Sequence, residues 1–170
     1  MIEILILYQI SKKVLTMYGI SREIKSEFSV LLTPSYGTIS PALRRLEKDF
    51  CIKSQKIMSE GGRPSVYYSI TKDGEQKLKE LILQEPLENP IQFLPSARAK
   101  LVCSIVLNNS EKKELFNILK IKSESIIIDI KKLLQHNETD FYKKMVYDNL
   151  LCEYKNFVSL LEGFERACKN

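Results

Sequence analysis

The stretch SYGTISPALRRLEKDF, residues 35–50, has the apolar spacing of a helix but contains two residues that helices disfavour. Gly37 and Pro41 are poor helix formers, and a proline costs roughly 3 kcal/mol in a helix interior. At about 100° per residue, both lie on one face with Lys48, flanked by Arg44 and Arg45. The opposite face is predicted to bury against other helices and contains Tyr36, Ile39, Leu43 and Leu46.

Two interpretations of this outward face are open. It can be an ordinary surface helix that tolerates a proline kink. It can also be a thin, cationic face that approaches another molecule, because Gly37 has no side chain and Pro41 can pack on a sugar or a thymine methyl. Arg44 and Arg45 could then reach phosphates or guanine edges. The surrounding elements favour the second interpretation.

Helical patterns precede this stretch at about residues 2–15 and 18–28, and Thr33 with Pro34 is predicted to start the third helix. After the third helix the apolar period changes to two over residues 51–70, which predicts a strand, a tight turn and a second strand. Arg63 stands in this turn next to Gly62 and Pro64. A helix capped by Thr71 follows. Three helices and a two-stranded wing are typical of the winged form of the helix-turn-helix, whose third helix enters the major groove.

The second half of the chain is helical by pattern. Prolines at 86, 90 and 95 predict a hinge over residues 85–95, with helices at about 96–107, 110–135 and 138–168 beyond it. In the last helix, apolar residues recur at alternating steps of three and four residues, and they form a stripe that is called the seam below. This seam either forms a dimer interface or packs on the chain's own preceding helix. Its predicted dimerisation residues are Tyr147, Leu150, Tyr154, Phe157, Leu161 and Phe164.

Composition limits the classes of protein to which the chain can belong. The net charge is +5, and residues 1–84 hold 13 basic and 9 acidic residues, so the positive excess lies in the first half. No apolar run approaches the roughly 18 residues that span a bilayer. The four cysteines and the single His136 lack metal-ligand spacing, so no cofactor or metal is expected. Scattered cysteines without a signal peptide indicate a cytoplasmic protein, and no catalytic cluster indicates an enzyme.

The segments SYGTISPALRRLEKDF and GGRPSVYYSITKDGEQKLKEL together resemble the PadR family of bacterial transcriptional regulators, over roughly residues 2–84. The resemblance implies a mainly α (α+β) chain, with a winged helix-turn-helix domain at 1–84, a hinge at 85–95 and an all-α dimerisation domain at 96–170. It implies a homodimer that binds an inverted-repeat operator on double-stranded DNA, usually as a repressor. A small aromatic effector that releases the DNA is a further expectation, and it would bind near the dimer interface.

The predicted DNA-binding residues are those at positions that match the family's segments and those on the outward face of the third helix. They are Ser35, Tyr36, Gly37, Thr38, Ser40, Pro41, Arg44, Arg45 and Lys48 on the third helix, and Gly62, Arg63 and Pro64 on the wing. The sequence departs from the family at Ser40, where an aromatic residue is frequent, and at Phe50, where glycine is common after the helix. The competing hypothesis is a winged-helix adaptor, whose basic face binds an acidic protein and which has no operator of its own.

Overall fold

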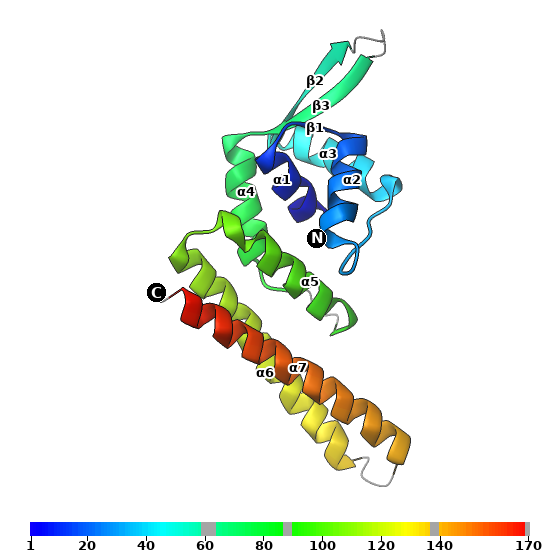
Figure 1. The fold of residues 1–170 in the computed structure, drawn as a ribbon, viewed down its shortest axis with the longest axis vertical. Helices are drawn as coiled ribbons and strands as arrows, with labels where there is room; N and C mark the ends of the chain where they lie inside the picture. Colours follow the sequence, from blue (N-terminus) through cyan, green and yellow to red (C-terminus); the bar gives the residue numbers. More distant parts are fainter. Residues whose placement is uncertain (59–63, 87–89, 137–139, 169–170) are drawn as a thin grey trace. The chain divides into compact units, whose positions relative to one another are not determined.

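The structure, a computed structural model, describes residues 1–58, 64–86, 90–136 and 140–168. The chain divides into two compact units, residues 1–106 and 107–170. The mainly helical fold with a small sheet confirms the predicted fold class. The first unit contains α1 (Ile2–Lys12), β1 (Leu15–Thr16), α2 (Met17–Phe28), α3 (Tyr36–Lys48), β2 (Ile52–Met58), β3 (Pro64–Ile70), α4 (Lys72–Leu83), α5 (Pro90–Cys103) and a short 3-10 helix, Ser104–Val106 (Figure 1).

Helix α1 is the centre of the first unit. All seven residues from Ile4 to Ile10 are buried, because α2, α3, α4, α5 and β3 all contact this helix. A helix that is apolar on every side is stable only when it is covered on every side. The helix ends at Lys12, three residues before the predicted end, because Leu15 and Thr16 pair with Tyr68 and Tyr67 of β3. This two-residue strand was missed from the sequence because it is too short to show a period.

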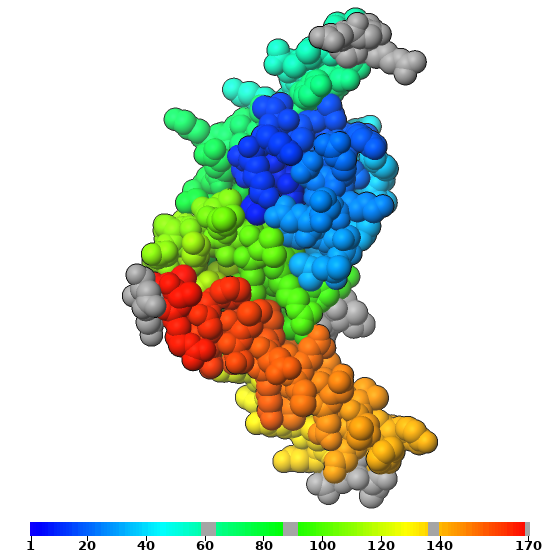
Figure 2. Space-filling model, viewed as in Figure 1, coloured from blue at the N-terminus to red at the C-terminus, as the bar shows by residue number. Residues whose placement is uncertain are grey.

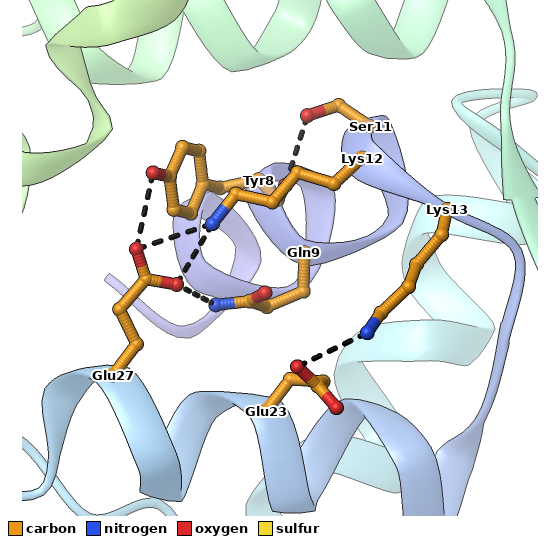
Figure 3. A network of polar contacts seen from close by, with 7 residues as sticks. All are labelled: Tyr8, Gln9, Ser11, Lys12, Lys13, Glu23 and Glu27. Atoms are coloured by element: carbon orange, nitrogen blue, oxygen red, sulfur yellow. Dashed lines mark hydrogen bonds and ion pairs between the residues drawn. The ribbon is translucent and has the colours of Figure 1, made fainter.

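A polar network fastens α1 to α2 through the carboxylate of Glu27 (Figure 3). The Gln9 amide donates at 2.7 Å, the Lys12 ammonium at 2.8 Å and the Tyr8 hydroxyl at 3.2 Å. Lys12 also lies over the Tyr8 ring, 3.8 Å from its centre. Burial opposes ionisation of Glu27, but the hydrogen bonds from Lys12 and Gln9 outweigh it and lower the pKa of the carboxyl.

Helix α3 begins later than predicted. Ser35 is its N-cap, and its hydroxyl lies 3.1 Å from that of Thr38. Thr33 does not cap the helix because its hydroxyl donates to the Ser29 carbonyl at 3.3 Å, and Pro34 therefore lies outside the helix.

The exit of α3 is a Schellman turn, with Phe50 at a φ of 57° where glycine is favoured. The Phe50 N–H donates to the Glu47 carbonyl at 3.1 Å, and the Cys51 N–H donates to Leu46 at 2.9 Å. The turn thus keeps its ordinary hydrogen bonds although Phe50 replaces glycine, a residue without the steric penalty of a Cβ in this conformation.

The wing is the hairpin of β2 and β3, which pair antiparallel from Ile52↔Ile70 to Met58↔Pro64. Strand β3 is central in the order β1-β3-β2. The ends of the hairpin are held at one junction. The Thr71 N–H donates to the Cys51 carbonyl at 3.1 Å, and the Thr71 hydroxyl donates to Phe50 at 2.7 Å. The same hydroxyl accepts from the Gly74 N–H at 3.1 Å, which confirms Thr71 as the cap of α4.

The second unit is a hairpin of two long helices, α6 (Asn109–His136) and α7 (Phe141–Ala167). Asn108 and Glu111 cap α6 reciprocally, at 2.9 and 2.7 Å, so α6 begins one residue before its predicted start at residue 110. Asp140 caps α7. Phe164 stacks on Phe116 of α6, with ring centres 5.8 Å apart.

The predicted seam of α7 divides between buried and accessible positions. Tyr154, Phe157 and Leu161 are buried within the chain, whereas Tyr147 and Leu150 are half-buried. Helix α5 begins at Pro90, not at Ser96. Residues 87–89 of the predicted hinge lie outside the described residues, so the hinge and the boundary at residues 85–95 stay predictions.

Gly74 is expected to tolerate no side chain. A Cβ there would lie 1.9 Å from the Cys51 carbonyl oxygen and 2.8 Å from Ile70 Cγ1. We expect Gly74→Ala to lower the free energy of unfolding by about 1–3 kcal/mol, or to unfold the first unit. Urea unfolding followed by circular dichroism measures this change.

Gly163→Ala is the matched control, because a Cβ at this helical position meets no described atom within 4 Å. It should raise stability by about 0.5–1 kcal/mol. Equal effects of the two substitutions would show that the junction at Cys51 does not constrain the first unit.

Candidate nucleic-acid interface

Helix α3 separates its two faces sharply. Ile39, Ala42, Leu43 and Leu46 are at most 2% exposed and pack toward the body of the first unit. The opposite face is exposed at Gly37, Thr38, Pro41, Arg44, Arg45 and Lys48, and Ser35 before it is exposed too. Ser40 is half-buried. The helix therefore presents to solvent the poor helix formers and cations that the wheel assigns to this side.

Tyr36 does not lie on the buried face to which the helical projection assigns it. It was predicted to bury with Ile39, but its side chain is 47% exposed. Tyr36 is the first residue of α3, about one turn before the buried stripe that starts at Ile39. Its ring is therefore accessible beside Gly37.

The space around Gly37 is open. Among the described residues outside the helix's own backbone, a Cβ at this position would meet the Ser35 hydroxyl alone, at 3.6 Å. Packing inside the protein therefore does not require glycine here. Pro41 lies four residues later and lacks an N–H, so the helical hydrogen bond to the Gly37 carbonyl is missing. Two helix-weakening residues therefore lie on one exposed face, and the described residues around Gly37 give no packing reason for a glycine.

The cations of α3 differ in their surroundings. Arg45 Nε donates to the Glu3 carboxylate of α1 at 2.9 Å. Among the described residues, Arg44 and Lys48 form no ion pair. Arg44 and Lys48 are therefore more available to a negatively charged partner than Arg45 is.

The wing joins α3 through a hydrogen bond from the Ser54 hydroxyl to the Glu47 carboxylate. Side chains two apart on a strand share a face, so Lys56 and Met58 lie on the same sheet face as Ser54. Tyr68, opposite Ser54, is on this face too. Burial raises the Tyr68 pKa, as does Glu47, while Arg44 opposes the rise. Ser54 and Tyr68 therefore lie between the cations of α3 and Lys56 on this sheet face.

Two accessible residues were missed from the sequence. Lys56 is exposed on β2, and the two-residue period of the strand could have assigned it to the face of Ser54. Tyr18 at the start of α2 is 65% exposed, and the helix before a recognition helix crosses the DNA backbone in this motif. On the wing, Pro64 is exposed at the start of β3, whereas Gly62 and Arg63 lie outside the described residues.

Within the described part of the chain, no cluster of three acidic, cysteine or histidine side chains could hold a metal ion. None of the described helices is long and apolar enough to cross a membrane.

Comparisons with known proteins identify the family of the chain. The family model of the transcriptional regulator PadR-like family matches residues 6–80. Among solved structures, a PadR-like transcriptional regulator from Bacillus cereus is 32% identical over 46% of this chain and 74% of its own, with a TM-score of 0.40. A PadR family transcription regulator from Clostridium difficile is 33% identical over 46% and 79%, with a TM-score of 0.40.

Bacillus subtilis PadR in complex with operator DNA is 22% identical over 98% of each chain, with a TM-score of 0.48. A search of curated proteins found no significant match. Residues 6–80, which the family model matches, include α3 and both strands of the wing. The chain belongs to the PadR-like family of transcriptional regulators, with its DNA-binding winged helix in the first unit.

Proposed function

We propose that this protein is a homodimeric repressor that binds an inverted-repeat operator. In this proposal, α3 enters the major groove with Gly37, Pro41, Arg44 and Lys48 toward the DNA. The observation that carries the proposal is the open space around Gly37, since a glycine that packing does not need is explained by close approach to a ligand. A duplex groove requires such an approach along a helix.

The start of α3 is proposed to contact the DNA backbone. Ser35, Tyr36, Thr38 and Ser40 surround the first turn, where unpaired N–H groups and the helix dipole favour a phosphate. On the wing, Lys56 is a proposed phosphate contact, because it shares a sheet face with the residue that touches α3. Gly62, Arg63 and Pro64 remain the proposed wing-tip contacts.

Gly37→Ala tests the close approach directly. The substitution should leave the free energy of unfolding unchanged or raise it by about 0.5–1 kcal/mol, because the new methyl meets no protein atom closely. Operator affinity should fall by about tenfold or more, which is about 1.4 kcal/mol. Gly163→Ala, in the second unit, should bind DNA like the unmodified protein in the same fluorescence anisotropy titration. An unchanged affinity of Gly37→Ala would contradict the docking of this face.

Arg44→Ala should lower operator affinity by about 1–3 kcal/mol if the side chain reads a base. Arg45→Ala should have a smaller effect, because Arg45 is already paired with Glu3. Titrations on the operator and on a random duplex separate base reading from backbone contact. An equal loss on both duplexes would make Arg44 a phosphate contact, and a larger loss for Arg45 would reverse the proposed order.

The dimer is proposed to form through the accessible apolar residues of the second unit. On α7, Tyr142, Met145 and Val146 are 81%, 56% and 63% exposed, and Ile121 and Ile128 of α6 are 59% and 54% exposed. Tyr142, Met145 and Val146 are three and four residues apart, so they share one face of α7, and an exposed apolar face of this kind marks an interaction surface. A second copy is the proposed occupant, because two operator half-sites need two readers. Tyr147, Leu150 and Phe164 would border this surface, while Tyr154, Phe157 and Leu161 would support it from inside.

A double variant, Met145→Glu with Val146→Glu, should convert the dimer to a monomer in analytical ultracentrifugation and weaken operator binding. Asn156→Glu, a charge introduced at an exposed position of the same helix, should leave the dimer intact. If the double variant stays dimeric at micromolar concentration, the dimer forms elsewhere.

The adaptor remains the second proposal, because the positive first half could also bind an acidic protein. A gel-shift scan of the DNA around the protein's own gene decides between the two. A specific shift that weakens with salt supports the operator proposal. If no fragment shifts at moderate salt, the adaptor is favoured. Release by a small aromatic effector is part of the first proposal.

A further inference from the structure

One edge of the exposed face of α3 is paired with an acidic residue of α1. Arg45 Nε donates to the Glu3 carboxylate at 2.9 Å, and the two side chains are 56% and 25% exposed. At about 100° per residue, Arg45 lies about 80° around α3 from Gly37, whereas Lys48 lies about 20° from it. Arg45 therefore stands at the edge of the face, where it can be drawn toward α1.

The fold does not depend on this ion pair. All residues of α1 from Ile4 to Ile10 are buried, so apolar contacts hold the helix in the first unit whether or not Glu3 is paired. An ion pair between two accessible side chains contributes little to stability, because water screens it and two long side chains must be ordered. A structural role is therefore a weak explanation for an acidic residue beside this face.

A carboxylate and a phosphate compete for the same N–H groups of an arginine, because the oxygens of both accept from a guanidinium. Among the described residues, Arg45 contacts Glu3 through Nε alone, and its Nη groups form no hydrogen bond. A phosphate that approached the Nη groups would lie close to the negative charge of Glu3, and like charges repel. Arg45 can therefore bind a phosphate fully only after it leaves Glu3.

We propose that Glu3 is an intramolecular competitor that withholds Arg45 from the DNA backbone and so lowers the affinity of the protein for every duplex. This inference rests on the proposed DNA-binding function. A phosphate contact carries no sequence information, so restraining one weakens binding to the operator and to other sequences alike. Glu3 therefore sets the strength of DNA binding and not the choice of sequence.

The test is a double-mutant cycle of Glu3→Gln and Arg45→Ala, measured by fluorescence anisotropy. The probes are a random duplex and the fragment that the gel-shift scan shifts most strongly. Glu3→Gln should raise the affinity for both by about threefold to tenfold at low salt. The plot of log affinity against log salt concentration should steepen by up to about 0.9, because one more phosphate is neutralised. Arg45→Ala should then lower affinity by a larger factor in the Glu3→Gln background than in the unmodified protein.

Glu80→Gln is the charge-matched control. Glu80 is exposed on α4, accepts from the Gln76 amide at 3.1 Å and, among the described residues, forms no ion pair. Its substitution changes the net charge equally but releases no cation, so the affinity should change by less than about twofold. The Tm of Glu3→Gln should lie within about 3 °C of that of the unmodified protein. Glu3→Ala is a second neutral variant should Glu3→Gln unfold.

The proposal is overturned if Arg45→Ala costs less affinity after Glu3→Gln than before, because Glu3 would then hold Arg45 in position for the phosphate. Independent effects of the two substitutions overturn it as well, as does an equal gain from Glu80→Gln. A gain confined to the specific fragment also overturns it, since Arg45 would then read a base. In each of these cases the protein binds DNA, so the proposed function stands. If no duplex binds at low salt, the proposed function fails together with this inference.

Discussion

Hydrogen bonds and close packing around the Cys51 carbonyl connect the end of α3, the wing and the start of α4. It accepts the Thr71 N–H, so the start of β2 and the end of β3 meet there. The residue before it, Phe50, closes the Schellman turn of α3 and accepts the Thr71 hydroxyl. That hydroxyl also caps α4, whose Gly74 lies against the Cys51 carbonyl. The exit of α3, the base of the wing and the start of α4 therefore share one set of hydrogen bonds, and the direction of the wing follows from it.

The exposed face of α3 contains residues that destabilise the helix, whereas the buried face stabilises it through apolar contacts. Ile39, Leu43 and Leu46 are almost fully buried, and burying each such side chain contributes about 1.5–3 kcal/mol. That contribution offsets the loss from Gly37 and the roughly 3 kcal/mol penalty of a helical proline. The helix can thus remain folded with a face on which side-chain volume and one N–H are absent. Residues that reduce stability without a packing reason are expected at functional surfaces.

The sequence predicted the elements with a clear period or cap. The buried stripe of α3, the β2–β3 hairpin and the Thr71 cap follow from local patterns, and the structure confirms them. Prediction from the sequence was wrong where tertiary contacts decide the local structure. Strand β1 exists only because β3 offers it a partner, Tyr36 lies beyond the reach of covering helices, and the side chain of Thr33 is diverted to Ser29. Lys100 gave no signal at all, since its burial depends on α1 and α4, which are distant in sequence.

Two charged groups of the first unit, the exposed Glu27 and the buried Lys100, affect the pH dependence of stability in opposite ways. Glu27 receives donors from Tyr8, Gln9 and Lys12, and its pKa is lowered. Its contribution to stability is therefore present above the ordinary pKa of glutamate and is lost as the pH falls through the lowered value. Lys100 has the opposite sign. Its ammonium weakens the fold fully below pH about 8, and this penalty disappears as the pH rises toward the ordinary lysine value of 10.5. At neutral pH the Glu27 network therefore stabilises the fold, whereas the buried ammonium of Lys100 destabilises it.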